Sequence, residues 1–265
     1  MLLLFCPIDS KTPQHSYFWS TSIQSMNTMT SVPKIAIMQP YVFPYLGYFQ
    51  LLQAVDTFVF YDDVNFIKRG WINRNRILIN GKDKLITFPC QGASQNKLIN
   101  EVGVDTSDKA FRKLLKSFSM AYANAPYYPT VYPLIEQVLS AKYDSIAELA
   151  AASVATIAEH LGLDKVFQYS AQTYPNSQGL PKADRLIHIA KQAGYSHYVN
   201  AIGGQAIYEK AYFRSKGVSL YFLAPQLPPY PQFDNEFVPG LSIIDVLMFN
   251  STAQALKMLN AYQLI

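Results

Sequence analysis

Cysteine is scarce in this chain, and its two copies, Cys6 and Cys90, lie in unrelated contexts. A pair so far apart does not form a disulfide framework, so the sequence predicts a protein of a reducing compartment, the cytoplasm. Long apolar runs are also missing, since none approaches the ~18 residues that a membrane-spanning helix requires. Half of the 265 residues are nevertheless hydrophobic, enough for a folded core without disulfides or metals. The composition therefore predicts a soluble globular protein.

Motifs of the commonest enzyme classes are absent as well. The chain contains no Gly-x-Ser-x-Gly elbow, no Walker loop and no GxGxxG turn, which excludes the usual hydrolases, kinases and dehydrogenases. Histidines are few, and His160, His188 and His197 are too widely spaced to predict a zinc site. We therefore predict no metal site, and the sequence identifies no cofactor.

Charged residues are nearly absent from the first 33 positions, which hold only Asp9 and Lys11. This stretch has neither helical nor strand periodicity, so we predict that residues 1–33 form a disordered extension and residues 34–265 form one α/β domain. Its apolar start is too short for a signal peptide, and no basic residue precedes it. The alternative start sites of translation are Met1, Met26 and Met29.

Short apolar runs that alternate with helical segments predict the fold class. Residues 34–38 and 57–61 form apolar, β-rich runs, and residues 45–55 between them have apolar side chains at helical spacing. A strand, a helix and a strand in this order make a βαβ unit, which implies a parallel sheet. The last third alternates in the same way, with strands at 166–170, 197–201 and 218–223 and helices at 182–192 and 205–216. We therefore predict an α/β protein with a mostly parallel sheet of βαβ units and helices on both faces.

A β-hairpin and a helical segment are expected between these two parts. Residues 76–79 and 84–88 are β-rich, and the Asn-Gly at the start of residues 80–83 between them is a strong turn signal. The pattern predicts an amphipathic helix over residues 108–122, ended by the proline-rich residues 126–133.

Two more helical regions follow. The Ala-rich residues 134–161 are expected to form two helices with a break near residues 143–145. A C-terminal helix should begin near Ser242, with Asp245 at the capping-box position three residues later.

Positive charge is concentrated in residues 68–84, which hold six Lys and Arg side chains against Asp83 alone. This window carries +5 and the whole chain +4, so the remaining residues together carry −1. Arg74 and Arg76 are two positions apart and project from one face of a strand, where two guanidinium groups can grip one phosphate or carboxylate. The binding residues predicted in this window are Lys68, Trp71, Asn73, Arg74 and Arg76.

Trp71 favours a small-molecule pocket over the alternative, a solvated basic surface. Its large ring is costly to expose beside charges, and a base or a sugar could stack on it. Nucleic acid is not expected, because a polymer needs many more phosphate contacts spread along a face.

Two loops follow predicted strands at the edge where ligands bind in parallel sheets. The first leads into a helix N-terminus, whose free N–H groups favour anions. Gly47 within that helix costs about 1 kcal/mol relative to Ala, so either close packing or a ligand requires a missing side chain. Gly203-Gly204 in the second loop lets backbone amides approach an anion, although a simple tight turn is the alternative. The residues predicted to bind substrate here are Gln39, Tyr45, Gly47, Tyr48, Gly203, Gly204 and Tyr208.

Asp62 and Asp63 end the strand predicted at residues 57–61 and are the catalytic candidates. Adjacent strand side chains point to opposite faces, so at most one of the two faces the cleft, where it could act as a base or bind an ammonium group. The stiff, aromatic residues 228–232 are expected to form a cleft wall, which adds Gln232 to the binding candidates.

Three blocks of the sequence resemble the WbqC-like family of bacterial proteins. They are residues 34–77, residues 200–210 with residues 217–225, and residues 229–250. Members of that family are encoded among genes for O-antigen and other surface polysaccharides, and the resemblance implies the glycine or aminoacyl transferase role proposed for some of them. Residues 45–48 are also similar in layout to the HxGH region of nucleotidyltransferases, with tyrosines in place of both histidines.

The leading hypothesis is a transferase that adds an acyl or aminoacyl group, such as glycyl, to an activated amino sugar. Arg74, Arg76 and Lys68 would hold a diphosphate or carboxylate, and Trp71 and Tyr48 would stack on the ring. The alternatives are a non-catalytic binding or scaffold protein of the polysaccharide pathway and a nucleotidyltransferase-like enzyme. The expected partner is a small molecule, with a nucleotide sugar as the example, while donor, acceptor and oligomeric state stay open.

Overall fold

A computed structural model describes residues 32–104 and 109–265 of the chain. The start sites considered above, and all of the predicted N-terminal extension except Val32 and Pro33, lie outside the described residues. The first strand begins at Lys34, as its pattern predicts.

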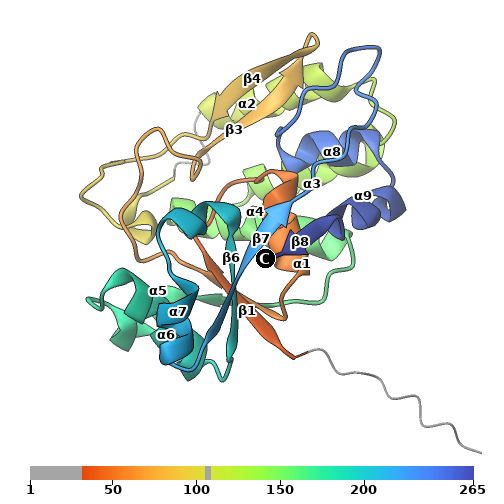
Figure 1. Cartoon of the computed structure of the whole chain (residues 1–265). Coiled ribbons are helices and arrows are strands. Elements are labelled where there is room, and N and C mark those ends of the chain that lie inside the picture. The colour runs from red at the N-terminus through yellow and green to blue at the C-terminus, as the bar shows by residue number, and fades with distance from the viewer. Residues whose placement is uncertain (1–31, 105–108) are drawn as a thin grey trace, which may run out of the picture. The chain divides into compact units, whose positions relative to one another are not determined.

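Six strands form the main sheet, in the order β5-β2-β1-β6-β7-β8 (Figure 1). The strands are β1 (Lys34–Met38), β2 (Thr57–Phe60), β5 (Val166–Tyr169), β6 (His197–Ala201), β7 (Ser219–Pro225) and β8 (Tyr262–Leu264). Every neighbouring pair is parallel except β7 and β8, so the predicted fold class, α/β with a mostly parallel sheet, is confirmed. The antiparallel edge strand β8 was not predicted.

The order of the strands reverses at β1. From β1 the chain adds β2 and then β5 on one side, and it then crosses back to place β6 and β7 on the other. Ligands in open parallel sheets bind beyond the carboxyl ends of the strands at such a reversal. The loops after β1 and β6 are therefore where a site is expected.

Helices cover both faces of the sheet, as predicted. They are α1 (Leu46–Gln53), α2 (Lys109–Tyr122), α3 (Tyr128–Ser140), α4 (Ile146–His160), α5 (Ser170–Thr173), α6 (Lys182–Gln192), α7 (Lys210–Ser215), α8 (Ile243–Phe249) and α9 (Thr252–Leu259). Ile35 and Ile37 of β1 belong to the cluster packed with α6 and α7, whereas Ala36 belongs to the larger cluster with α1, α3, α4 and α8. The strand thus divides its side chains between two cores with period two.

The predicted hairpin is present, and it lies within the long connection between β2 and β5 (Figure 1). Its strands β3 (Arg74–Ile79) and β4 (Lys82–Thr87) form a separate two-stranded sheet. Asn80 and Gly81 at the turn have φ values of 51° and 72°. Positive φ at both turn residues is what a two-residue hairpin of this twist requires, which explains the Asn-Gly.

Two helix predictions need correction. The helix predicted over residues 108–122 does end at Tyr122, but the next helix, α3, begins at Tyr128 and contains Pro133, whereas it had been expected to begin at residue 134. Pro129 occupies the first turn, where proline is tolerated, and the burial of Val131 and Ile135 stabilises the rest of the helix. The break predicted near residues 143–145 is confirmed between α3 and α4.

The helix predicted over residues 205–216 is replaced by a 3₁₀ turn, η3 (Ile202–Ala206), and by the short α7. Phe213 is the buried side chain of α7, so this segment buries too little apolar surface to stabilise a longer helix. The shorter 3₁₀ helices η1 (Ile99–Glu101) and η2 (Pro175–Ser177) complete the described elements.

Asp245 does not cap its helix. Helix α8 is capped by Ser242, whose hydroxyl oxygen accepts from the Ile244 N–H. The Asp245 carboxylate is fully buried and instead accepts hydrogen bonds from Tyr122, Tyr230 and Gln232. The capping-box prediction at this position is therefore wrong.

Candidate functional site

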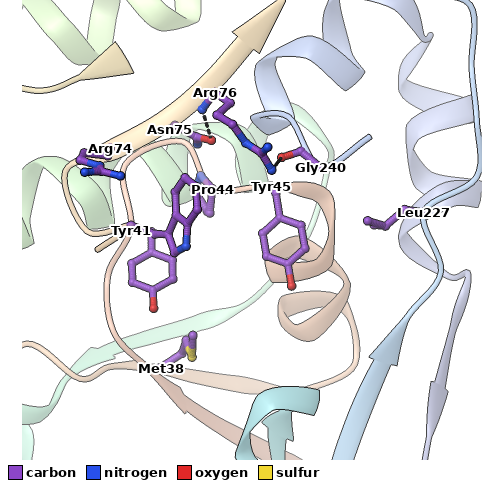
Figure 2. Close-up of a pocket in the computed structure, with 10 residues that line it drawn as sticks. Met38, Tyr41, Pro44, Tyr45, Arg74, Asn75, Arg76, Leu227 and Gly240 are labelled. Carbon is purple, nitrogen blue, oxygen red and sulfur yellow. Dashed lines mark hydrogen bonds between the residues drawn. The ribbon is translucent and has the colours of Figure 1, made fainter. Parts of the chain in front are cut away.

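A pocket of about 390 Å³ lies between the loop after β1 and the hairpin (Figure 2). We call it the arginine pocket, and it is lined by Met38, Tyr41, Pro44, Tyr45, Trp71, Arg74, Asn75, Arg76, Leu227 and Gly240. Arg74 and Arg76 enter it from β3, Met38 lies on the opposite side at the end of β1, and Tyr41 and Tyr45 stand between them (Figure 2). The predicted site residues that meet here are Tyr45, Trp71, Arg74 and Arg76.

The two guanidinium groups retain free hydrogen-bond donors. The Arg74 side chain makes no hydrogen bond to a described residue, and the buried Nε atoms of Arg74 and Arg76 both lack an acceptor within the described part of the chain. Arg76 does donate from Nη1 to Asp83 at 3.3 Å and from Nη2 to the Gly240 carbonyl at 3.4 Å. Trp71 lies close to both, 6.0 Å and 5.7 Å from its ring to the guanidinium carbons of Arg74 and Arg76. Uncommitted charged donors beside an aromatic ring suit an anion that carries a ring.

The asparagines that alternate with the arginines hold the hairpin in place. Asn73 Nδ2 donates to the Phe88 carbonyl at 2.9 Å. Asn75 Nδ2 donates to the carbonyls of Val42 and Phe43 in the loop after β1. Because side chains on a strand alternate, Asn75 can anchor β3 to that loop while Arg74 and Arg76 reach into the pocket, which Asn75 also borders.

Gly47 makes room for Tyr45. Tyr45 is the N-cap residue of α1 with an extended backbone, and its ring folds back over the first turn of the helix. A Cβ at position 47 would lie 2.5 Å from Cε2 of that ring, so only glycine allows this arrangement. The close packing expected at Gly47 is thus packing against a residue of the pocket.

Tyr48 lies in the core and not in the pocket. Its side chain is 2% exposed, and its hydroxyl donates to the Gln39 carbonyl at 2.9 Å. Tyr41 occupies the pocket wall that was expected of Tyr48. Burial and the nearby Tyr45 raise the pKa of Tyr41 to about 12, and burial raises the pKa of Tyr45. Both hydroxyls therefore stay protonated near neutral pH and can donate hydrogen bonds to a ligand.

Asp62 and Asp63 lie in a buried and largely paired cluster. Asp63 Oδ2 accepts from Arg185 Nη2 at 2.5 Å and from Gln178 Nε2 at 2.9 Å. Asp62 Oδ1 accepts from the Ser170 hydroxyl and from the Ala171 N–H, both at 3.0 Å. Asp62 also borders a different pocket of about 350 Å³, and a catalytic role for either residue stays a prediction.

The remaining candidates occupy three other places. Gln39, Gly203, Gly204 and Tyr208 line a second pocket of about 300 Å³, which shares Met38 with the arginine pocket. Gln232 is fully buried and binds Asp245 through its amide nitrogen at 2.6 Å. Lys68 is exposed on the loop that precedes β3.

Several lining residues of the arginine pocket had not been predicted. Leu227 and Gly240 come from the segment between β7 and α8, 140 and 153 positions after Thr87 at the end of the hairpin, and no local pattern marks them. Tyr41 and Pro44 carry a weak signal, because they belong to the loop after the first strand. In residues 32–104 and 109–265, no three His, Cys, Asp or Glu side chains gather closely enough to hold a metal ion.

Fold and pocket together define an α/β protein with a candidate anion site beyond the ends of its strands. The chain belongs to the WbqC-like protein family, whose model matches residues 39–257. It is also 28% identical over 225 residues to an uncharacterised protein of Mycobacterium tuberculosis, a match that covers 84% of this chain and 95% of that protein. No solved structure shows significant similarity to the chain. Among the described residues, no helix combines the length and the apolar character that crossing a membrane requires.

Proposed function

We propose that this protein is a transferase of bacterial surface polysaccharide biosynthesis that adds an acyl or aminoacyl group to an activated amino sugar. The observation that carries the proposal is the convergence of Arg74, Arg76 and Trp71 with two tyrosines in one pocket. Family membership supports the pathway, because the resemblance implies a place among genes for O-antigen and related glycans.

The guanidinium groups of Arg74 and Arg76 bind the phosphate or diphosphate of the activated sugar. Their buried, unpaired Nε atoms favour an anionic ligand, because a buried donor without an acceptor costs about 1–3 kcal/mol. Trp71 is 47% exposed at the pocket and offers a face for the sugar ring. The Tyr45 hydroxyl donates to a sugar oxygen, and the Tyr41 hydroxyl, whose proton is directed at Gln39 Oε1, accepts from a sugar hydroxyl.

The chemical step joins the amine nitrogen of the sugar to the acyl carbon of an activated donor. The bond between the acyl carbon and its thiol or phosphate leaving group breaks, and the leaving group accepts the amine proton. Tyr41 and Tyr45 are poor proton acceptors here, since burial raises both pKa values. The residues of the pocket thus bind and orient, and the leaving group completes the proton balance.

A scaffold role is less well supported. A scaffold needs an exposed apolar surface, whereas an enzyme needs donors aimed at a ligand. Tyr41, Tyr45 and Trp71 share one concave pocket, while Tyr48 is buried and the Tyr230 hydroxyl donates to Asp245 at 2.6 Å. These five aromatic side chains therefore lie in the pocket or inside the protein and do not form an open docking face.

Calorimetric titration with nucleotide sugars tests the binding half of the proposal. The test variant is Arg74→Ala with Arg76→Ala, and the control is Lys82→Ala with Lys84→Ala, which removes the same charge from exposed positions of the same hairpin. Loss of two charge-assisted donors should weaken binding at least about tenfold. The lysine control should change the affinity by less than about threefold. Equal affinities of the wild type and the arginine variant would reject the proposed function.

A further inference from the structure

The second pocket lies where the strand order reverses. It is lined by residues at the carboxyl ends of β1 and β6, with Gln39 directly after β1 and Asn200 within β6. Its volume of about 300 Å³ is at the lower end of the range for small-molecule sites. In doubly wound sheets this crevice is the usual place for a nucleotide or a similar ligand.

The walls of this pocket suit a flat, uncharged group. Among the described residues that line it there is no charged side chain, and Tyr61, Tyr198, Leu186 and Ile207 supply aromatic and apolar surface. Tyr61 is in contact with Arg185, whose guanidinium carbon lies 4.6 Å from the ring centre. The charge of Arg185 is itself balanced by Asp63. The paired cluster thus holds a neutral aromatic wall in place.

Two carboxamide groups in the pocket have free donors. Asn200 is 8% exposed, and its Oδ1 accepts from the Ala201 N–H at 2.8 Å, while its Nδ2 donates to no acceptor in the described part of the chain. A Cβ on Gly204 would lie 2.7 Å from this Nδ2, so glycine at position 204 is needed for the Asn200 side chain to adopt this position. Gln39 likewise has its Oε1 engaged by the Tyr41 hydroxyl at 3.4 Å, and its Nε2 has no acceptor among the described residues. Such donors pair with carbonyl or ring-nitrogen acceptors.

Met38 lines both pockets, so they are neighbours at the end of β1. A ligand long enough to extend past Met38 would place an anionic group on Arg74 and Arg76 and a second group between Gln39 and Asn200. The arginine pocket favours a negatively charged group of the ligand. The second pocket favours an uncharged, flat ring that carries hydrogen-bond acceptors.

We propose that the second pocket binds the nucleobase of a nucleotide-activated sugar whose phosphates are held by Arg74 and Arg76. This assignment rests on the proposed function, because it takes the arginine pocket as the phosphate site. It gives Gln39 and Asn200 the role of reading the edge of the base, and Tyr61 and Tyr208 the role of its aromatic walls.

The test compares the binding of inorganic pyrophosphate with that of UDP, dTDP, CDP, GDP and ADP to the full chain. The blocking variant is Gly203→Leu, because Gly203 lines the pocket and a Cβ there meets nothing within 4 Å, so the larger side chain is accepted without a clash. The control is Ala206→Leu, which places the same leucine side chain at an exposed position of the same 3₁₀ turn. A second variant, Gln39→Leu, removes one donor.

At least one nucleoside diphosphate should bind the wild type about tenfold or more tightly than pyrophosphate, because stacking and base contacts add to the phosphate contacts. Gly203→Leu should abolish this gain and leave pyrophosphate binding intact, which also shows that the variant is folded. Gln39→Leu should reduce the gain, and Ala206→Leu should preserve it.

Equal affinity of the wild type for pyrophosphate and for all five nucleotides would overturn the nucleobase assignment and leave the arginine site standing. A gain that survives Gly203→Leu would overturn it as well. Conversely, nucleotide binding that is sensitive to Gly203→Leu but indifferent to Arg74→Ala with Arg76→Ala would support the ring pocket and reject the phosphate role in the proposed function.

Discussion

Two arginine clusters of this protein differ in what pairs with them. Arg185 is 6% exposed and binds the Asp63 carboxylate at 2.5 Å and the Ser177 hydroxyl at 3.2 Å. Arg74 and Arg76 are half-buried, each has a buried Nε without an acceptor among the described residues, and their one carboxylate contact is a 3.3 Å pair with the exposed Asp83. A charge that the chain itself satisfies stabilises the fold, and a charge that it leaves unsatisfied points to a ligand.

The same comparison bears on the catalytic role predicted for Asp63. Asp63 was predicted as a base because it ends a strand at the binding edge, but its carboxylate is committed to Arg185 and Gln178. A proton acceptor needs a free lone pair directed at the substrate. The structure therefore supports a positioning role for Asp63, through Arg185 and the Tyr61 ring.

The largest loss of stability is expected from Asp63→Ala. The substitution leaves Arg185 as a buried charge without its partner, which costs about 3–5 kcal/mol of unfolding free energy. Urea denaturation followed by circular dichroism measures the loss. The double variant Asp63→Ala with Arg185→Met should be less destabilised than Asp63→Ala alone, because it removes the unpaired charge. A loss below about 1 kcal/mol for Asp63→Ala would show that the pair contributes little, contrary to its burial.

A smaller loss is expected from Gly47→Ala at the edge of the arginine pocket. The added methyl group would lie 2.5 Å from the Tyr45 ring, and such overpacking costs about 1–3 kcal/mol. Alanine has a higher helix propensity than glycine, which offsets about 1 kcal/mol, so the net destabilisation is about 0–2 kcal/mol. The same denaturation experiment measures it.

Tyr45→Ala supplies the control for that experiment. With the ring absent, Gly47→Ala should become neutral or stabilising by up to about 1 kcal/mol. If Gly47→Ala destabilises both backgrounds equally, the glycine serves something other than the Tyr45 ring.

The strands were easier to predict than the pocket, for a physical reason. Lys34–Met38 is set by its own apolar run, and its observed bounds equal the predicted ones. The shared face of Arg74 and Arg76 follows in the same way from the period of a strand. Such patterns are local, so the sequence displays them.

Side-chain direction at a helix start is not local. Tyr45 and Tyr48 look equivalent in the sequence, yet Tyr45 precedes the helix with an extended backbone and faces the pocket, while Tyr48 lies within α1 and enters the core. Leu227 reaches the pocket only because β7 places the following segment beside the loop after β1. No spacing in the sequence encodes such a long-range contact.

Arg74→Ala with Arg76→Ala should change stability little although it abolishes the proposed phosphate site. The exposed Arg76–Asp83 pair is worth about 0–1 kcal/mol, and the Arg76 bond to the Gly240 carbonyl is long at 3.4 Å. The Nε atoms of the two side chains form no bond within the described chain that could be lost. We expect the unfolding free energy to change by less than about 1 kcal/mol in urea denaturation. A loss like that of Asp63→Ala would show that these arginines stabilise the fold and would remove the contrast between the clusters.

A further loss of stability is expected at alkaline pH, where each cluster has one tyrosine with a raised pKa. Burial raises the pKa of Tyr41 and of Tyr61 to about 12 in the folded protein, compared with the ordinary value of 10.0. The unfolded chain therefore releases these protons first, so the stability they contribute is complete below pH 10 and is lost as the pH rises towards 12.

Urea denaturation at pH 9 and pH 11 measures this loss, with Tyr41→Phe and Tyr61→Phe as the two variants. Each substitution removes one titrating hydroxyl, so each should make the difference between the two pH values smaller than in the wild type. Tyr61 faces Arg185, which opposes the rise in its pKa, and Tyr41 has no such cation among the groups that shift its pKa. In the Arg185→Met background the pKa of Tyr61 should rise further, because a phenolate there loses its favourable charge, whereas Tyr41→Phe should have the same effect in both backgrounds. An equal response of the two tyrosines to Arg185→Met would mean that the two clusters are electrostatically coupled and not separate.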